Sequence, residues 1–399
     1  MKNRHYLTTQ ILLVALGLGL VWLSIRNVTW SDVVIIFRQL SVPELIPILL
    51  LNFGVLVALT TRWWLLLKGF GFSLPFLRVM RYRTTVFALG YLTPGPQVGG
   101  EVLAVYYPTR HKVPASVALA AASVDKTLEL LANFTFIAIG SYIVLVGQHL
   151  ISEADLIALG LLSTLLLIPV AVLVAIWRGR HPISGFMLWL EKLAPLRWRV
   201  RLRKMPVIRS LPNMHRLEAT VMHSEDLIAW LCREQPWTLV AAIAATLGAW
   251  MCTLTEFWLV TRALGLLLTP AQAIGTLVLI YFAFTTPMPG GLGAVEAAIL
   301  LAFTTFGFSS SQAVSLSLFI RMRDLTEAAI GLLLGGAAWR TPHTDILAVS
   351  PATAELPPPP VTRRTAAAAL AATGDADGVA DAPASAAATP EVLLPEPPR

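Results

Sequence analysis

The sequence predicts an all-α polytopic membrane protein with about six full spans and two Pro/Gly-broken re-entrant hairpins arranged as an inverted repeat. Three observations lead to this fold class. Hydrophobic residues make up 56% of the 399 residues and charged residues only 13%, whereas soluble domains average about 25% charged residues. The apolar residues form segments of bilayer length. Lysine and arginine concentrate between those segments.

Uninterrupted apolar segments supply the predicted full spans, because a helix needs about 20 mostly apolar residues to cross a bilayer. They are Leu7–Ile25, Leu45–Leu67, Ala115–Val146, Leu156–Trp177, Thr238–Leu264 and Gln312–Trp339. The first could imitate a signal peptide, but no small-residue cleavage site follows it. We therefore expect it to be retained as a helix.

Two further apolar segments, Thr84–Tyr107 and Ala271–Phe306, contain proline and glycine near their centres. Both residue types interrupt a helix, so each segment is predicted to form two short halves. We interpret each as a re-entrant hairpin. If both hairpins instead cross completely, the number of crossings rises to about ten and the termini stay on the same side.

The distribution of basic residues predicts the orientation, because cytoplasmic loops are enriched in lysine and arginine. The residues assigned to that side are Lys2, Arg4, Lys68, Arg78, Arg81, Arg83, Arg110, Lys112 and those of Arg178–Arg233. Gln148–Asp155 and Gly265–Pro270 contain neither residue type, and only Arg26 and Arg38 break the pattern. We expect a multi-pass protein of the cell inner (cytoplasmic) membrane with both termini in the cytoplasm.

These assignments divide the chain into a membrane domain and a tail. Residues 1–345 form the membrane domain, composed of a first half (1–177), a basic cytoplasmic loop (178–236) and a second half (237–345). The basic run Arg197–Lys204 either lies on the inner leaflet or only orients the chain. Residues 346–399 are rich in proline and alanine and are predicted to be a disordered cytoplasmic tail. The net charge of +7 lies largely in loops, so no nucleic-acid partner is expected.

The two broken segments resemble each other in sequence. The first reads Thr93-Pro-Gly-Pro-Gln-Val-Gly-Gly-Glu101 and the second Thr286-Pro-Met-Pro-Gly-Gly-Leu-Gly-Ala-Val-Glu296. An arginine near the end of a span precedes each, Arg62 and Arg262, and a charged cluster follows each. In the predicted layout the hairpins enter from opposite sides of the membrane, as in transporters built from inverted repeats.

Charged residues on the next span extend the repeat. Glu101 precedes Asp125 by 24 positions (125 − 101), and Glu296 precedes Asp324 by 28 (324 − 296). At helical spacing, Arg321 is placed to pair with Asp324 and Arg323 with Glu327. The alternative to a binding role is that static ion pairs hold the helix bundle together.

Pro-Gly breaks at membrane depth leave backbone groups unpaired, so these groups must face protein or a water-filled cavity. The free N–H groups of a half-helix suit an anion such as phosphate. The alternative is that proline and glycine serve only packing and kinks. We expect Glu101 and Glu296 to face one cavity, with Arg321 or Arg323 as the main anion partner. The candidate headgroup-binding residues are Pro94, Gly95, Gly99, Gly100, Glu101, Asp125, Lys126, Pro289, Gly290, Gly291, Gly293, Glu296, Arg321, Arg323 and Asp324.

At these motifs the chain resembles the lysylphosphatidylglycerol synthase transmembrane-region family, the flippase-like membrane portion of bacterial aminoacyl-phospholipid synthases. The resemblance is carried by Pro94-Gly95, Gly99-Gly100-Glu101, the Asp125-Lys126 span, Gly290-Gly291-Leu-Gly293 with Glu296, and Arg321 with Arg323, and it covers about residues 5–340. Family members often carry an arginine where this chain has Gln97 or Leu103-Ala104, and also where Lys126 stands. These departures fall at positions where the resemblance implies contacts to an anion.

The resemblance implies a protein that handles lipid headgroups, with translocation between leaflets as the expected activity. The substrate would be an anionic phospholipid or a polyprenyl-phosphate-linked sugar. A membrane-embedded transferase using Glu101, Glu296 or Asp125 as general base is one alternative. A non-transporting partner subunit of a lipid or glycan synthesis pathway is the other.

Further expectations concern catalysis and partners. The family's soluble aminoacyl-transferase domain has no counterpart in this sequence, so lysyl transfer is not expected. No metal-ligand cluster or cofactor motif is evident, and we expect neither a metal nor a cofactor. A lipid-synthesis enzyme or a glycosyltransferase is a candidate partner, and the oligomeric state is not predicted.

Overall fold

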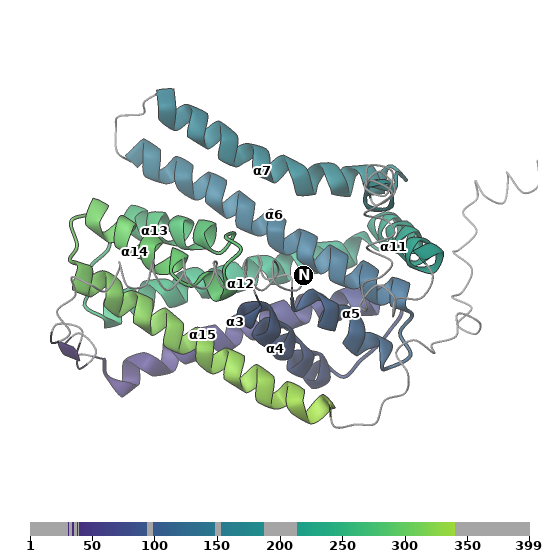
Figure 1. Ribbon diagram of the computed structural model, residues 1–399, viewed down its shortest axis with the longest axis horizontal. Helices are drawn as coiled ribbons and strands as arrows, with labels where there is room; N and C mark the ends of the chain where they lie inside the picture. The colour runs from purple at the N-terminus through teal and green to yellow at the C-terminus, as the bar shows by residue number, and fades with distance from the viewer. Residues whose placement is uncertain are drawn as a thin grey trace, which may run out of the picture. The chain divides into compact units, whose positions relative to one another are not determined.

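The computed structural model describes residues 40–93, 99–147, 153–186 and 214–339, with a few positions between 31 and 38. Its principal helices are α3 (Val42–Gly69), α4 (Phe76–Leu92), α5 (Glu101–Thr109), α6 (Ala115–Gly147), α7 (Glu153–Trp177), α11 (Met214–Glu234), α12 (Pro236–Ala263), α13 (Pro270–Ala283), the 3-10 turn η1 (Pro289–Gly291), α14 (Ala294–Thr305) and α15 (Ser310–Trp339) (Figure 1). No strand occurs within these ranges, so the described chain is helical as predicted. It divides into units Met1–Ala348 and Val349–Arg399, and these helices lie in the first.

In the part of the chain that the structure describes, three helices are long and apolar enough to cross a membrane: α3, α6 and α12. They correspond to predicted spans, and the chain is accordingly a multi-pass membrane protein. The predicted spans Leu156–Trp177 and Gln312–Trp339 also form helices, α7 and α15. The total number of spans stays a prediction, and the expected first span, the basic run 197–204 and the tail lie outside the described residues.

Both broken segments fold as two helices separated by an interruption. In the first half, α4 ends at Leu92 and α5 begins at Glu101. In the second half, α13 ends at Ala283 and α14 begins at Ala294, with η1 between them. α13 and α14 pack against each other, as do α4 and α5. Re-entry into the membrane remains a prediction.

The helices of the two halves pack in a matching pattern (Figure 1). α3 lies along α12, which holds the corresponding place in the other half. α4 packs on α15, and its counterpart α13 packs on α6. The short helices behave alike, because α5 packs on α6 and α14 on α15. Each helix of one half thus makes the contacts that its counterpart makes in the other half, which supports the internal repeat inferred from the motifs. These contacts place each broken segment against a long helix.

A close helix crossing joins α4 to α15. A side-chain carbon at Gly331 would lie 2.3 Å from the carbonyl oxygen of Thr84, and one at Gly335 would lie 2.4 Å from the Thr85 side chain. The Thr85 hydroxyl donates to the Gly331 carbonyl at 3.2 Å. Glycines four positions apart permit such close approach between membrane helices. The contact fixes α4, and with it the start of the first break.

The structure corrects the assignment of three arginines. Arg78, Arg81 and Arg83 lie within α4, which begins at Phe76, and not in a loop. Arg81 donates to the carbonyl of Leu334 on α15 at 2.8 Å. Arg83 is 13% exposed and points into a cluster of charged side chains. Counting basic residues along the chain therefore made the predicted loop too long, and it did not identify Arg83 as a buried cation.

The amphipathic helix α11 is fixed to the end of α7. The Glu225 carboxylate, 1% exposed, accepts hydrogen bonds from the Ile183 amide at 2.7 Å and the Ser184 hydroxyl at 2.6 Å. Arg233 donates to the carbonyl of Trp177, the last residue of α7. The Arg233 contact satisfies a carbonyl at the end of α7, and the Glu225 contacts satisfy groups in the first turn of the short helix 182–186 that follows it.

Candidate functional site

Arg321, on α15, is held at the second break by every donor that it has. Its Nε and Nη2 donate to the two carboxylate oxygens of Glu296 at 2.6 and 2.9 Å. Nη1 donates to the Tyr91 hydroxyl at 2.7 Å and to the Gly290 carbonyl, and Nη2 also donates to the Gly291 carbonyl at 3.1 Å. A guanidinium group has five N–H donors, and these bonds use all five.

Glu296 has two roles at the start of α14. It occupies the first turn of that helix, where a carboxylate is favoured by the helix dipole. Its Oε2 accepts a hydrogen bond from the Gly293 amide at 2.7 Å, which caps the helix. The same carboxylate pairs with Arg321, and both side chains are nearly buried, at 11% and 12% exposed. Arg321 and Glu296 form what we call the second-half pair.

Tyr91 connects the two broken segments. It lies in the last turn of α4, just before the first break, and its hydroxyl contacts Arg321 at the second break. Gly290 has a φ of 54°, and a side-chain carbon there would lie 2.7 Å from the Tyr91 ring. Only glycine meets both conditions without strain. The end of α4 and η1 therefore pack directly together.

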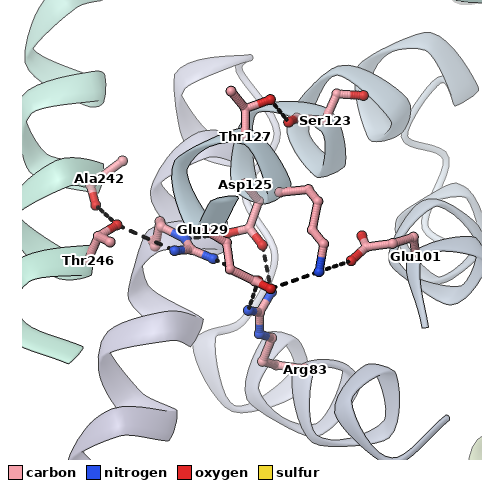
Figure 2. Close-up of polar contacts among 10 residues, drawn as sticks. Arg83, Glu101, Ser123, Asp125, Thr127, Glu129, Ala242 and Thr246 are labelled. Atoms are coloured by element: carbon pink, nitrogen blue, oxygen red, sulfur yellow. Dashed lines mark hydrogen bonds and ion pairs between the residues drawn. The ribbon is translucent and has the colours of Figure 1, made fainter. Parts of the chain in front are cut away.

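A second group of charges lies in the first half of the chain, which Figure 2 shows. We call it the first-half cluster; it consists of Arg62, Arg83, Glu101, Asp125, Lys126 and Glu129. Asp125 lies at its centre and accepts hydrogen bonds from Arg62 Nε and Arg83 Nη1, both at 2.6 Å. Three cations face three carboxylates, so the cluster is neutral when all are charged. Balanced charge of this kind is what makes burial within a membrane tolerable.

Lys126 lies between two carboxylates at the edge of this cluster. Its amine donates to Glu129 at 2.7 Å and lies 3.3 Å from Glu101, the first residue of α5. These contacts account for two of the three donors of an ammonium group. The side chains of Lys126 and Glu101 are 20% and 30% exposed, more than those of the second-half pair.

The Lys126–Glu101 pair is the counterpart of the second-half pair. Lys126 follows Glu101 by 25 positions (126 − 101), and Arg321 follows Glu296 by the same 25 (321 − 296). Each glutamate lies in the first turn of a short helix after a break, and each cation lies on the next long helix. This equivalence corrects the pairing drawn from the sequence, in which Asp125 had matched Asp324 at unequal spacings.

Arg323 forms a third group with acidic residues. It pairs with Glu256 on α12 at 2.9 Å and with its neighbour Asp324 at 2.8 Å. The intrahelical pairs expected for α15 are replaced, since Arg321 binds Glu296 and Arg323 binds Glu256 and Asp324. Cross-helix partners are available because α12, α14 and α15 meet here. Residue spacing along α15 alone cannot predict which residues of other helices lie beside it.

The remaining candidate residues lie at the breaks. Gly99 and Gly100 precede α5, Pro289 begins η1, and Gly293 precedes α14. Pro94 and Gly95 lie outside the described residues. The structure thus places the described candidates in three ion-pair groups and at two breaks.

Five residues of these groups were not among the candidates: Arg62, Arg83, Tyr91, Glu129 and Glu256. A signal existed for Arg62, Glu129 and Glu256, because a charged residue within an apolar span is itself a functional indication. Arg83 was misassigned to a loop. Nothing in the pattern around Tyr91 distinguishes it from an ordinary aromatic residue in an apolar segment.

The described charged residues of the site are arranged as ion pairs between helices. Within the described ranges, no three histidine, cysteine or acidic side chains are grouped as a metal site would require. The two cysteines are both free, and they lie on different helices. Charged groups therefore pair across helices near two backbone interruptions.

Comparison with known proteins identifies the chain at the level of its family. A search of curated proteins finds no match. The family model described as "Lysylphosphatidylglycerol synthase TM region" matches residues 10–334, which include both breaks and all three ion-pair groups. This match confirms the resemblance carried by the two motifs, and it indicates a membrane protein with a lipid-related function. The chain belongs to the lysylphosphatidylglycerol synthase TM region family.

Proposed function

We propose that this protein translocates an anionic phospholipid or a polyprenyl-phosphate-linked sugar between the leaflets of the membrane, and that the lipid phosphate binds at Lys126. The observation that carries the proposal is the contrast between two equivalent cations. Lys126 is 20% exposed and has a third donor beyond its contacts to Glu101 and Glu129. Arg321 uses all of its donors within the protein.

This contrast assigns different roles to the two halves. Arg321 fixes η1, α14 and the end of α4 to one another, so it acts as a stationary contact. Among the described residues, Lys126 pairs with two carboxylates, and one of these contacts, at 3.3 Å to Glu101, is long for a charge-assisted hydrogen bond. The proposal therefore moves the main anion contact from Arg321 or Arg323 to Lys126.

Exchange of partners lowers the cost of moving a charged headgroup through the membrane. A phosphate that enters replaces Glu101 beside Lys126, and the displaced carboxylate is the more exposed partner at 30%. The Lys126 ammonium stays paired throughout, so it is not left alone in a low-dielectric environment. The apolar chains of the lipid meanwhile remain in hydrocarbon.

The contacts of Asp125 and Glu296 disfavour these two residues as the general base of a transferase. Asp125 is held between two guanidinium groups, and Glu296 binds both Arg321 and the Gly293 amide. These bonds occupy the carboxylate oxygens that would have to accept a proton from the substrate. Neither residue is well placed to remove a proton from a lipid substrate.

Reconstitution tests the proposal. The purified full chain is inserted into vesicles that contain fluorescent phosphatidylglycerol or, for comparison, fluorescent phosphatidylcholine. Quenching from outside measures how fast each lipid crosses, and mass spectrometry of the lipids detects any transferase product. We expect faster crossing of phosphatidylglycerol than in protein-free vesicles, with no change in lipid mass. Equal rates with and without the protein for phosphatidylglycerol and for a polyprenyl-phosphate lipid would contradict the proposal.

A further inference from the structure

Arg62 is a fully buried cation whose donors are incompletely used. Its side chain is 1% exposed. Nε donates to Asp125 at 2.6 Å, and Nη1 donates to the Thr246 hydroxyl at 3.4 Å, a long hydrogen bond. The buried Nη2 has no hydrogen-bond partner among the residues that the structure describes, although the Glu129 carboxylate lies 3.6 Å away. A buried donor that lacks a partner destabilises the state in which it occurs.

Glu129 lies between Lys126 and the two guanidinium groups of the cluster. Its Oε1 accepts a hydrogen bond from Lys126 at 2.7 Å. Its Oε2 lies 3.6 Å from Arg62 Nη2 and 3.5 Å from Arg83 Nη2. Both distances exceed the usual range for N–H···O hydrogen bonds. A small movement of this carboxylate would exchange one cationic partner for two.

We propose that Glu129 is an exchangeable carboxylate that holds Lys126 in the empty protein, and that once a lipid phosphate has replaced Glu101 beside Lys126, Glu129 also leaves Lys126 and moves onto the Nη2 groups of Arg62 and Arg83. Arg62 and Glu129 are thereby positioning residues for the headgroup, and this inference rests on the proposed headgroup site at Lys126. The exchange keeps Glu129 paired, which matters because an uncompensated buried carboxylate is strongly unfavourable. The unused donor of Arg62 becomes satisfied only in the lipid-bound state.

Arg62→Lys separates the two states. Lysine retains the charge that faces Asp125 but lacks a second nitrogen for Glu129. In the empty protein Arg62 Nη2 makes no hydrogen bond, so the unfolding temperature should change little. In the lipid-bound protein Glu129 loses a charge-assisted hydrogen bond, so the affinity for phosphatidylglycerol should fall about tenfold. Thr246→Val is the matched control, because it removes the long Nη1 contact and the hydroxyl's own bond to the Ala242 carbonyl, neither of which involves Glu129, and it should leave the affinity unchanged.

Glu129→Gln is a second test of the exchange, and it leaves Arg62 unchanged. A neutral amide holds Lys126 less tightly than a carboxylate, so phosphatidylglycerol should bind severalfold more tightly. In this background Arg62→Lys should no longer weaken binding of phosphatidylglycerol, since position 129 no longer carries a carboxylate that the Arg62 guanidinium would bind. The exchange therefore predicts strong coupling between the two substitutions in a double-mutant cycle.

The experiment measures binding of phosphatidylglycerol to the purified full chain in neutral detergent, through the lipid-induced rise in unfolding temperature, with phosphatidylcholine as reference. Coupled effects of Arg62→Lys and Glu129→Gln on affinity support the exchange. Independent effects, or weaker or unchanged binding by Glu129→Gln alone, overturn it. Lys126→Met shows whether a negative result rules out the headgroup site or only the movement of Glu129. If it binds phosphatidylglycerol as tightly as the unmodified protein, the headgroup site itself is wrong; if it loses binding while the cycle shows no coupling, only the exchange is wrong.

Discussion

Arg321 holds Glu296 through two hydrogen bonds across the start of α14, at 2.6 and 2.9 Å. The other half of the chain repeats this relationship with Lys126 and Glu101, at the same spacing of 25 positions (321 − 296; 126 − 101). In both halves a cation on a long helix fixes the first residues of a short helix after a break. The two pairs differ in strength, and the proposed function follows from that difference.

Arg321→Lys should destabilise the protein. Lysine supplies three donors where arginine supplies five, so carbonyl groups at the second break lose their partners. We expect a loss of about 3–6 kcal/mol, from two charge-assisted hydrogen bonds. Thermal unfolding of the purified protein measures the effect, with the exposed Arg178→Lys as control. An unfolding temperature equal to that of the control would show that Arg321 does not fix the break.

Tyr91→Phe removes the hydroxyl that accepts from Arg321 and leaves the ring against Gly290. One buried hydrogen bond to a charged group should be lost, which costs about 1.5–3 kcal/mol. Tyr142→Phe is the matched control, because Tyr142 is 55% exposed. The account requires that the Tyr91 variant unfold at a lower temperature than the Tyr142 variant. Identical transitions would mean that the two breaks are not coupled through this contact.

Gly331→Ala should weaken the crossing of α4 and α15. The added carbon would overlap the Thr84 carbonyl oxygen, 2.3 Å away, and would force the helices apart. Overpacking of this kind costs about 1–3 kcal/mol. Gly248→Ala tests the intrinsic effect of alanine in a helix, since open space surrounds that position. The yield of folded, monodisperse protein should fall for Gly331→Ala and stay normal for Gly248→Ala; a reversed order would contradict the packing described.

The predicted orientation is open to a labelling test. In a background with Cys232 and Cys252 replaced by serine, one new cysteine is introduced at exposed Gly185 or Leu267. The abundance of basic residues between 178 and 233 predicts that Gly185→Cys faces the cytoplasm. A membrane-impermeant maleimide should label Leu267→Cys in intact cells and Gly185→Cys only after permeabilisation. Labelling of Gly185→Cys in intact cells would reverse the topology.

Local sequence patterns predicted the helices well, because each depends on nearby residues. Long apolar runs indicated α3, α6 and α12, and proline and glycine marked the interruptions near Gly100 and Gly290. The identity of the ion-pair partners was harder to predict. It depends on which helices pack against each other, and the charge of a residue does not reveal that packing.

Arg83 and Arg321 illustrate this limit. Loop counting treats every arginine between apolar segments alike, yet α4 carries Arg83 into contact with Asp125. Spacing along α15 favoured Asp324 as the partner of Arg321, whereas the fold brings Glu296 from α14 to it. Spacing within one helix is a weak guide where several helices meet, because an arginine can bind a carboxylate on another helix and also donate to backbone carbonyl groups nearby.

The most direct test of the central claim compares Lys126→Met with Lys112→Met for transport of phosphatidylglycerol in reconstituted vesicles. Both substitutions remove one lysine charge, but Lys112 lies exposed in the turn before α6, away from the ion-pair groups. Folding of both variants is checked by thermal unfolding. If Lys126 binds the headgroup, its loss should slow translocation by about tenfold or more, the effect expected from one charge-assisted contact, while Lys112→Met transports normally. Equal transport by two folded variants would contradict the account.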